Sequence, residues 1–293
     1  MSDKKRILIM FGGTSPEHEV SRNSASCVAQ NIDRERFDVD LIGITKDGRW
    51  FLTNAEPHEM ADGSWSERED NIPAVISPDR SVHGYVTGAP GSAEGKQVYV
   101  DCVFHVFHGE CGEDGTIQGL MKLADIPFVG PDMTASACCM DKTVTKMIVD
   151  RTGIRQAKYF YTTRFEFARH PEEDIKEIEE MFNGEYPLFI KPACTGSSVG
   201  ITKAKNRKEL FEGLKKALSY ALTMKKEGYV PAVVVMGDLE NEGAIEKQIN
   251  WDTLPENVKA VKEYVPELSM MFVYAHPEKL DLVKSKLNPS HFK

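Results

Sequence analysis

The chain has 293 residues, of which 41% are hydrophobic and 28% are charged, a composition typical of a globular protein with room for about two domains. A formal net charge of −9 without a stripe of lysine or arginine argues against a nucleic-acid partner. The six cysteines form no C-x-x-C pair, so we expect reduced thiols and a cytoplasmic protein.

The N-terminus superficially resembles a secretory signal, because basic residues precede the apolar run 7–11. That run stops at two glycines, which is too short for a signal, and no small-residue cleavage site follows. No stretch of the chain is long enough to span a bilayer, so we expect no membrane partner.

Strand and helix patterns alternate through the first half of the chain. Ser15-Pro16 predicts the start of a helix, with serine as N-cap and proline at the first helical position. The polar stretch 54–80 predicts surface loops. Strands separated by helices predict a parallel α/β sheet. The expected strands are 6–11, 37–44, 98–107 and 126–129, and the expected helices are 15–32 and 116–124.

The second half begins with a long predicted helix, 134–152, that ends at Gly153. Apolar runs and amphipathic stretches then alternate again, with weaker signals beyond residue 222. The expected strands are 158–162, 188–190, 201–204, 230–236 and 270–274, and the expected helices are 209–222, 256–264 and 278–287.

The first motif, residues 12–21, reads GGTSPEHEVS and joins a strand to a helix. It lacks the G-x-G-x-x-G spacing of a dinucleotide site, which argues against a nicotinamide dehydrogenase. A carboxylate at Glu17, in the first helical turn, would repel phosphate but attract an ammonium group. Taken alone, the motif favours a simpler role, in which Glu17 complements the helix dipole or forms a capping box with Thr14.

The second motif, residues 108–116, reads HGECGEDGT and begins where a strand ends, the place where open α/β sheets bind ligands. His108 is therefore a candidate substrate contact. His105 and His108 stand three apart and would point to opposite faces of a strand, so we expect no metal chelation by this pair. For Glu113 and Asp114 the expected role is to cap the next helix.

The third motif, residues 191–200, reads KPACTGSSVG. It places Lys191 at the end of a strand and a small-residue loop directly after it. Glycines let backbone N–H groups approach phosphate oxygens, and serines add donors, although a plain hairpin turn has the same composition. Lys142, within the predicted long helix, is in isolation a surface lysine.

Taken together, these residues resemble the D-alanine–D-alanine ligases, a family of the ATP-grasp fold. The resemblance covers about Lys5 to Leu218, and the stretch 75–84 resembles the branch that includes D-alanine–D-serine ligases. The matching pieces, in the order and spacing of the family, are Gly12-Gly13-Thr14-Ser15 through Ser21, His108 to Gly119, Met140-Asp141-Lys142, and Lys191-Pro192 with Gly196 to Gly200.

This resemblance implies an α/β protein of the ATP-grasp fold. We expect an N-terminal parallel-sheet α/β domain over 1–130, which binds substrate, and a central α+β ATP-grasp domain over 131–225. An atypical or truncated C-terminal region would occupy 226–293. The implied activity joins two D-alanines: ATP phosphorylates one carboxylate, and the second amine attacks the acyl phosphate.

The resemblance also implies the roles of individual residues. Glu17 would bind the ammonium group of the first substrate, supported by Ser197, and both are candidate catalytic residues. His108 would lie beside the same D-alanine. The residues that would hold ATP are Lys142, Lys191, Gly196, Ser198, Val199 and Gly200.

The implied cofactors are ATP and Mg²⁺, and the implied substrates are D-alanine and, for the related branch, D-serine. Family members dimerise through the N-terminal domain, which makes a homodimer an assembly to test. The metal ligands stay unassigned, because Glu256, Glu263 and Glu267 lie on a predicted amphipathic helix, where solvated carboxylates are expected.

Several family motifs are absent from the sequence after residue 222: a mobile loop with Tyr and Lys, an Arg-x-Asp strand, a Glu-x-Asn pair and a Pro-Gly turn. Two further hypotheses therefore remain beside a D-alanine ligase. One is an impaired remnant that binds a nucleotide or D-alanine. The other is a different ATP-grasp carboxylate–amine ligase, which the first two motifs disfavour.

Overall fold

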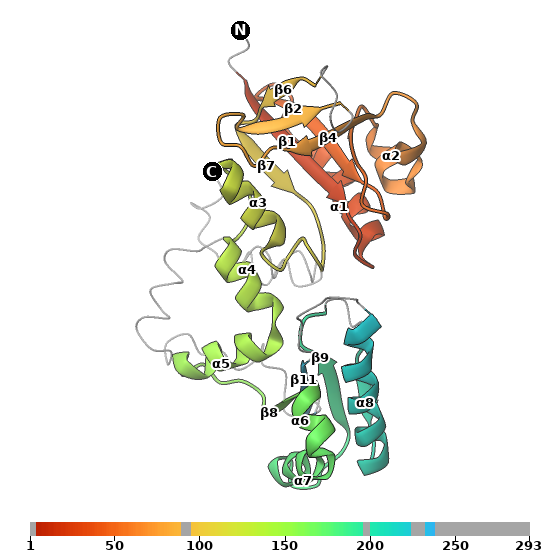
Figure 1. Ribbon diagram of the computed structural model, residues 1–293, viewed down its shortest axis with the longest axis vertical. Coiled ribbons are helices and arrows are strands. Elements are labelled where there is room, and N and C mark those ends of the chain that lie inside the picture. Colours follow the sequence, from red (N-terminus) through yellow and green to blue (C-terminus); the bar gives the residue numbers. More distant parts are fainter. Residues whose placement is uncertain (1–3, 89–94, 196–199, 224–231, 238–293) are drawn as a thin grey trace, which may run out of the picture. The chain divides into compact units, whose positions relative to one another are not determined.

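The computed structural model describes residues 4–88, 95–195, 200–223 and 232–237 (Figure 1). Contacts group residues 1–145 and 159–236 into one unit, and the second unit includes Lys146–Lys158. In that stretch the Gln156 side-chain amide donates to the Lys146 carbonyl at 2.8 Å. No helix within these described ranges has the length and apolar character that a membrane crossing requires.

The N-terminal region is built on a seven-stranded sheet with the order β6-β5-β4-β3-β2-β1-β7. Strand β1 pairs in parallel with β2 on one side and β7 on the other, as expected from strands separated by helices. From β2 to β6 every pairing is antiparallel, so the sheet is mixed. The strands are β1 (Lys5–Gly12), β2 (Phe37–Ile44), β3 (Trp50–Thr53), β4 (Ile72–Ile76), β5 (Gly84–Thr87), β6 (Gln97–Tyr99) and β7 (Cys102–His105).

Both faces of β1 are buried, because its successive side chains enter different cores. Leu8 and Met10 belong to one hydrophobic cluster, together with residues of helix α3 (Thr116–Ala124). Ile9 and Phe11 belong to a second cluster, together with residues of helix α1 (His18–Asn31). This two-sided burial explains the continuous apolar run of β1.

The stretch 54–80 is more ordered than its polar sequence predicts. It contains helix α2 (Pro57–Asp62), the short 3₁₀ helix η1 (Ser64–Glu67) and strand β4. Proline begins α2, and Glu56 and Glu59 form a capping box. Trp65 is buried edge-on against Phe11, at 4.9 Å between ring centroids. The expectation of surface loops was wrong, because Trp65, together with Met60 and Ala55, is buried in a hydrophobic core and anchors the segment.

The single strand expected over 98–107 is two strands, β6 and β7, on opposite edges of the sheet. Asp101 separates them, and its carboxylate accepts a hydrogen bond from the backbone N–H of Arg6 at 2.8 Å. Three residue steps from Tyr99 to Cys102 span at most about 10 Å, so the two sheet edges must approach each other and the sheet curls.

The long helix expected over 134–152 is likewise two helices, α4 (Met133–Met140) and α5 (Lys142–Thr152). Asp141 has ψ of 109°, which ends α4. Its carboxylate then accepts hydrogen bonds from the backbone N–H groups of Thr143 and Val144, as an N-cap does. The predicted end at Gly153 is confirmed, since Gly153 follows α5 with a φ of +73°.

A second, four-stranded sheet has the order β10-β9-β11-β8. The predicted strands at 158–162, 188–190, 201–204 and 230–236 and the helix at 209–222 are present with shifted ends. Helices α6 (Arg164–Arg169) and α7 (Pro171–Met181) were missed. The other elements are β8 (Tyr159–Thr163), β9 (Leu188–Pro192), β10 (Thr202–Ala204), α8 (Arg207–Thr223) and β11 (Ala232–Gly237).

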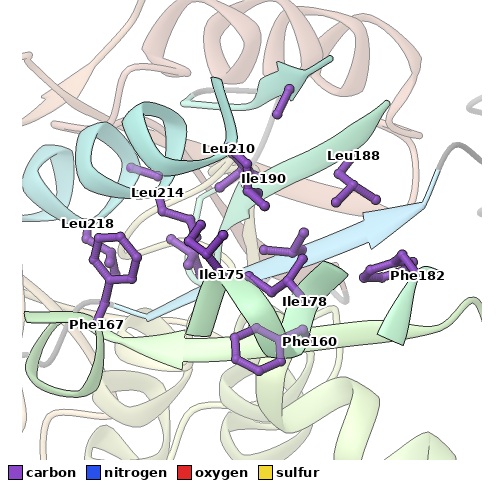
Figure 2. Packing of buried hydrophobic residues seen from close by; sticks show 14 residues of the cluster. Phe160, Phe167, Ile175, Ile178, Phe182, Leu188, Ile190, Leu210, Leu214 and Leu218 are labelled. Carbon is purple, nitrogen blue, oxygen red and sulfur yellow. The ribbon is translucent and has the colours of Figure 1, made fainter. Parts of the chain in front are cut away.

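The core of this sheet lies beneath α7 and α8 (Figure 2). Ile175 and Ile178 of α7 and Leu210 and Leu214 of α8 gather around Ile190 of β9, and each is at most 1% exposed. The elements expected at 256–264, 270–274 and 278–287 lie outside the described residues.

Candidate functional site

The first candidate site lies at the carboxyl ends of β1 and β7, the parallel part of the first sheet. The segment after β1 carries Glu17, and the loop after β7 carries His108. Side-chain donors tie the two segments together: the Ser15 hydroxyl donates to the His108 carbonyl at 2.8 Å, and the Ser21 hydroxyl donates to the Val106 carbonyl. Two segments about ninety residues apart thus form one surface.

Gly12 determines the turn that leaves β1. Its φ is +88°, and a Cβ atom there would lie 2.1 Å from the carbonyl oxygen of Ile44 on β2. Only glycine fits this position. The Gly12 N–H donates to the Ser21 hydroxyl at 2.8 Å, so the turn is also fastened to α1.

Glu17, not Ser15, occupies the N-cap position of α1, so the predicted helix start was too early. The Ser15 hydroxyl accepts a hydrogen bond from the Glu17 N–H at 3.1 Å, which forms a turn before the helix. Glu17 makes no side-chain capping bond, and the structure has no capping box with Thr14 at this helix.

The Glu17 carboxylate instead packs against the loop after β7. A Cβ atom at Gly109 would lie 2.3 Å from Oε2 of Glu17, and Gly109 has a φ of +69°. Glycine at this position therefore allows a carboxylate at the start of α1 to lie directly on the backbone of the second motif.

His108 lies within the same cluster. Its Nε2 is 3.1 Å from the Ser24 hydroxyl of α1, and its Nδ1 is 3.7 Å from Oε1 of Glu113. The Glu113 carboxylate, with a smaller contribution from the charge of Glu17, raises the pKa of His108, although burial opposes this shift. The raised pKa favours an imidazolium between two carboxylates.

Glu113 does not cap the next helix, which corrects the prediction from the sequence. Its Oε2 accepts a hydrogen bond from the Gly109 N–H at 3.0 Å, and contact with His108 lowers the pKa of the Glu113 carboxyl despite burial. Asp114 is not the N-cap of α3 either, because Gly115 holds that position, but its Oδ1 accepts from the N–H of Thr116, the first residue of the helix, at 3.0 Å. The signal that could have identified Glu113 is its spacing of five residues from His108 across a glycine turn.

His105 has surroundings different from those of His108. Its ring lies 6.4 Å from the Phe107 ring and 5.8 Å from the Phe128 ring, and burial lowers its pKa. Throughout the part of the chain that the structure describes, no group of three or more His, Cys, Asp or Glu side chains could hold a metal ion.

The second candidate site lies where α5 begins and β9 ends. The Lys142 ammonium group donates to the carbonyl of Thr195 at 2.6 Å and to that of Ala193 at 3.3 Å. Burial lowers the pKa of Lys142, and the positive charge of Lys191 lowers it further. Lys142 is therefore a half-buried lysine attached to the segment after β9, not a plain surface lysine.

The Asp141 carboxylate opposes the lowering of the Lys142 pKa, and an anion bound between the two lysines would relieve the repulsion that Lys191 exerts on Lys142. Lys142 and Lys191, from α5 and β9, thus suit a phosphate group. Of the loop predicted to close over it, Gly200 is described, with a φ of +77°. Gly196, Ser197, Ser198 and Val199 lie outside the described residues, so the predicted support of Glu17 by Ser197 stays a prediction.

Comparison with known proteins identifies the family. The family model "D-ala D-ala ligase N-terminus" matches residues 6–131, and "D-ala D-ala ligase C-terminus" matches residues 148–251. A D-alanine–D-alanine ligase of Clostridium novyi is 39% identical over 289 residues, covering 96% of this chain and 78% of the relative. The chain belongs to the D-alanine–D-alanine ligase family. The resemblance drawn from the four motifs is confirmed, and it extends beyond residue 218.

Two further relatives show how much of the sequence and of the fold this chain shares with known family members. D-alanine–D-alanine ligase B of Clostridium tetani is 40% identical over 250 residues, and the chain spans 65% of its length. The solved structure of the VanG D-Ala:D-Ser ligase from Enterococcus faecalis is 39% identical with a TM-score of 0.69. That match covers 80% of this chain and 63% of the neighbour. The α/β ATP-grasp fold expected from the resemblance is confirmed, with a first sheet that is mixed where a parallel one was expected.

Proposed function

We propose that this ligase-family chain joins two D-alanines in an ATP-dependent reaction that supplies a peptidoglycan precursor. The observation that carries the proposal is the cluster at the end of β1 and β7. There Glu17 and the imidazole of His108 lie on one glycine turn, beside a helix start. An amino acid zwitterion needs an anion for its ammonium group, and Glu17 supplies one.

Glu17 would bind the ammonium group of the first D-alanine and fix the direction of its carboxylate, with Ser197 as support. His108 would lie beside the same substrate. Binding in one orientation would hold the D-alanine carboxylate in place for phosphoryl transfer from ATP, which lowers the barrier of that step.

Lys142 and Lys191 would bind the phosphates of ATP and stabilise the negative charge that develops as the phosphoryl group moves. The positive charge of Lys191 acts on Lys142, which supports this role, because a phosphate would relieve the repulsion between them. Gly196, Ser198, Val199 and Gly200 would cover the phosphates with backbone and side-chain donors. Exclusion of water would protect the acyl phosphate from hydrolysis.

Mg²⁺ remains part of the proposal as an ion that, when bound, would neutralise negative charge on the ATP phosphates. The described residues present no cluster of ligands for it, so no step is assigned to the ion here. The domain borders near residues 130 and 225, a homodimer and a cytoplasmic location also stay proposals.

The second candidate is a remnant that binds D-alanine or a nucleotide without turnover. The second substrate is open as well, so D-serine is tested beside D-alanine.

The test is phosphate release from ATP by the purified chain with and without D-alanine, D-serine and Mg²⁺. Mass spectrometry of the products identifies the dipeptide. Phosphate release that depends on D-alanine and yields D-alanyl-D-alanine supports the ligase. A folded chain that binds D-alanine or ATP in calorimetry but forms no dipeptide supports the binding role instead.

A further inference from the structure

The loop after β7 holds one acidic side chain that the proposed reaction does not use. Glu113 is partly buried, and its side chain contacts its own loop and His108. Its two carboxylate oxygens have different partners: Oε2 accepts from the Gly109 N–H at 3.0 Å, and Oε1 is 3.7 Å from His108 Nδ1. One carboxylate thus connects the turn to the imidazole.

We infer that Glu113 is a positioning residue, which holds His108 as an imidazolium with its Nε2 directed at Ser24 of α1. The expected effect of Glu113 on turnover rests on the proposed function, whereas its effect on His108 rests on the contacts alone. The inference assigns a distinct role to each carboxylate of the cluster. Glu17 binds the ammonium group of the substrate, and Glu113 neutralises the positive charge of the His108 imidazolium.

The geometry supports this division. Nε2 of His108 is 3.1 Å from the Ser24 hydroxyl, and the ring is thus contacted at both nitrogens from two elements. A protonated imidazole donates from both nitrogens, to the hydroxyl on one side and toward the carboxylate on the other. At 3.7 Å the Glu113 contact acts mainly by charge, which is sufficient in a half-buried setting.

The charges around His108 point the same way. The groups that act on its protonation are Glu113 from its own loop and Glu17 from the start of α1, and both favour the protonated form. If Glu17 is bound by a substrate ammonium group, its charge is neutralised, and Glu113 is then the remaining one of these two charges that favours the protonated form of His108. Glu113 therefore matters most when the site is occupied.

The experiment follows the histidine signals of the full chain by NMR as a function of pH, with the His108 signal assigned from its loss in His108→Asn. In the unaltered chain we expect the titration midpoint of His108 above the ordinary histidine value. Glu113→Gln keeps an oxygen for the Gly109 N–H but removes the charge, and should lower this midpoint. Glu113→Asp should restore part of the shift.

The matched control is Glu19→Gln, an exposed glutamate of α1 that pairs with Lys46. It removes the same charge by the same substitution, and should leave the His108 midpoint unchanged. If the midpoint is the same in the unaltered chain and Glu113→Gln, or falls equally in Glu19→Gln, the inference is wrong.

Turnover provides the second readout. Glu113→Gln should raise the KM for D-alanine about tenfold, the scale of one hydrogen bond to a charged group. It should also move the pH profile of kcat/KM to lower pH. A kcat that falls with KM and pH profile unchanged would contradict a positioning role. If the NMR shifts are found but the unaltered chain forms no dipeptide, the proposed function fails while the role of Glu113 toward His108 stands.

Discussion

The two candidate sites balance their charges in opposite ways. At the ends of β1 and β7, the carboxylates of Glu17 and Glu113 surround the imidazole of His108, so opposite charges lie together. At the start of α5, burial lowers the pKa of Lys142 and the positive charge of Lys191 lowers it further, against the opposing charge of Asp141, so a like charge acts on this lysine. In the first site, Glu17 can bind the ammonium group of an amino acid while Glu113 stays beside His108. In the second site, the two lysines need a bound anion, such as a phosphate of ATP, to balance their charge.

The largest expected effect separates the two sites directly. Glu17→Ala and Lys191→Ala should each abolish dipeptide formation, with losses of at least about 10²–10³-fold, the scale of a lost charge stabiliser in an active site. Only Lys191→Ala should weaken ATP binding in calorimetry, because Glu17 belongs to the site without phosphate. Dipeptide formation that survives either substitution would refute the assignment of these residues.

A second prediction tests the contact between Glu17 and Gly109. Gly109→Ala should displace the Glu17 carboxylate and lower kcat/KM by roughly 10²-fold, since a shift of about 1 Å in a positioned group has this scale. Gly184→Ala is the matched control: Gly184 has a φ of +70°, close to the +69° of Gly109, but a Cβ atom added there would meet no other atom within 4 Å.

Both alanines adopt the same unfavourable backbone conformation and should lose roughly 1–2 kcal/mol of unfolding free energy. Urea unfolding measures this common loss. Equal kcat/KM values for the two variants would show that the contact between Glu17 and Gly109 is unimportant for activity. This result would weaken the assignment of Glu17 to the substrate site.

A third prediction concerns the fastening between β1 and β7. Ser21 is fully buried, accepts from the Gly12 N–H and donates to the Val106 carbonyl. Ser21→Ala leaves both groups without this partner, and should lower the unfolding free energy by about 1–3 kcal/mol. The exposed Ser66, whose hydroxyl donates to the Gly63 carbonyl, is the control, and Ser66→Ala should change it by less than about 0.5 kcal/mol.

The smallest effect is a pH dependence of stability from His108 and Glu113. The pKa of His108 is raised above 6.5, so its contribution is complete below pH 6.5 and is lost as pH rises through the folded-state pKa. The pKa of Glu113 is lowered below 4.5, so its contribution is present above pH 4.5 and is lost as pH falls through the folded-state pKa.

The pair therefore stabilises the chain most between those two ordinary values. The difference in unfolding free energy between the unaltered chain and His108→Asn should be largest in this window. It should stay below about 1 kcal/mol, because both groups are partly exposed. Urea unfolding from about pH 4 to about pH 9 checks the shape, and a difference that does not vary with pH would contradict the ion pair.

Much of the fold could be predicted from local patterns. The strand β2 and helix α3 match their expected ranges, and β1 differs by one residue at each end, since apolar runs and capping residues define them. The break at Asp141 could have been predicted, because an Asp one residue before Lys142 can cap a new helix. Helix α7 also carries local signals, with Pro171 followed by three acidic residues in its first turn.

The placement of Trp65 could not be predicted in this way. The segment around it is polar, but its Trp65 ring packs against Phe11 of β1 and Gly43 of β2, far away in the sequence, in a core cluster that also includes Met60. The division of 98–107 into two strands has a similar origin, since it depends on where Arg6 lies.

The sequence by itself determined the family, the parallel arrangement around β1 and the identity of the candidate residues, because motif order and hydrophobic period are local properties of the chain. Only the tertiary structure decided which of these residues act on one another. Glu17 meets Gly109, His108 meets Ser24, and Lys191 acts on Lys142, because strand pairing and helix packing bring together segments that are distant in the sequence. Electrostatic interactions depend on distance in space, and sequence separation does not fix that distance.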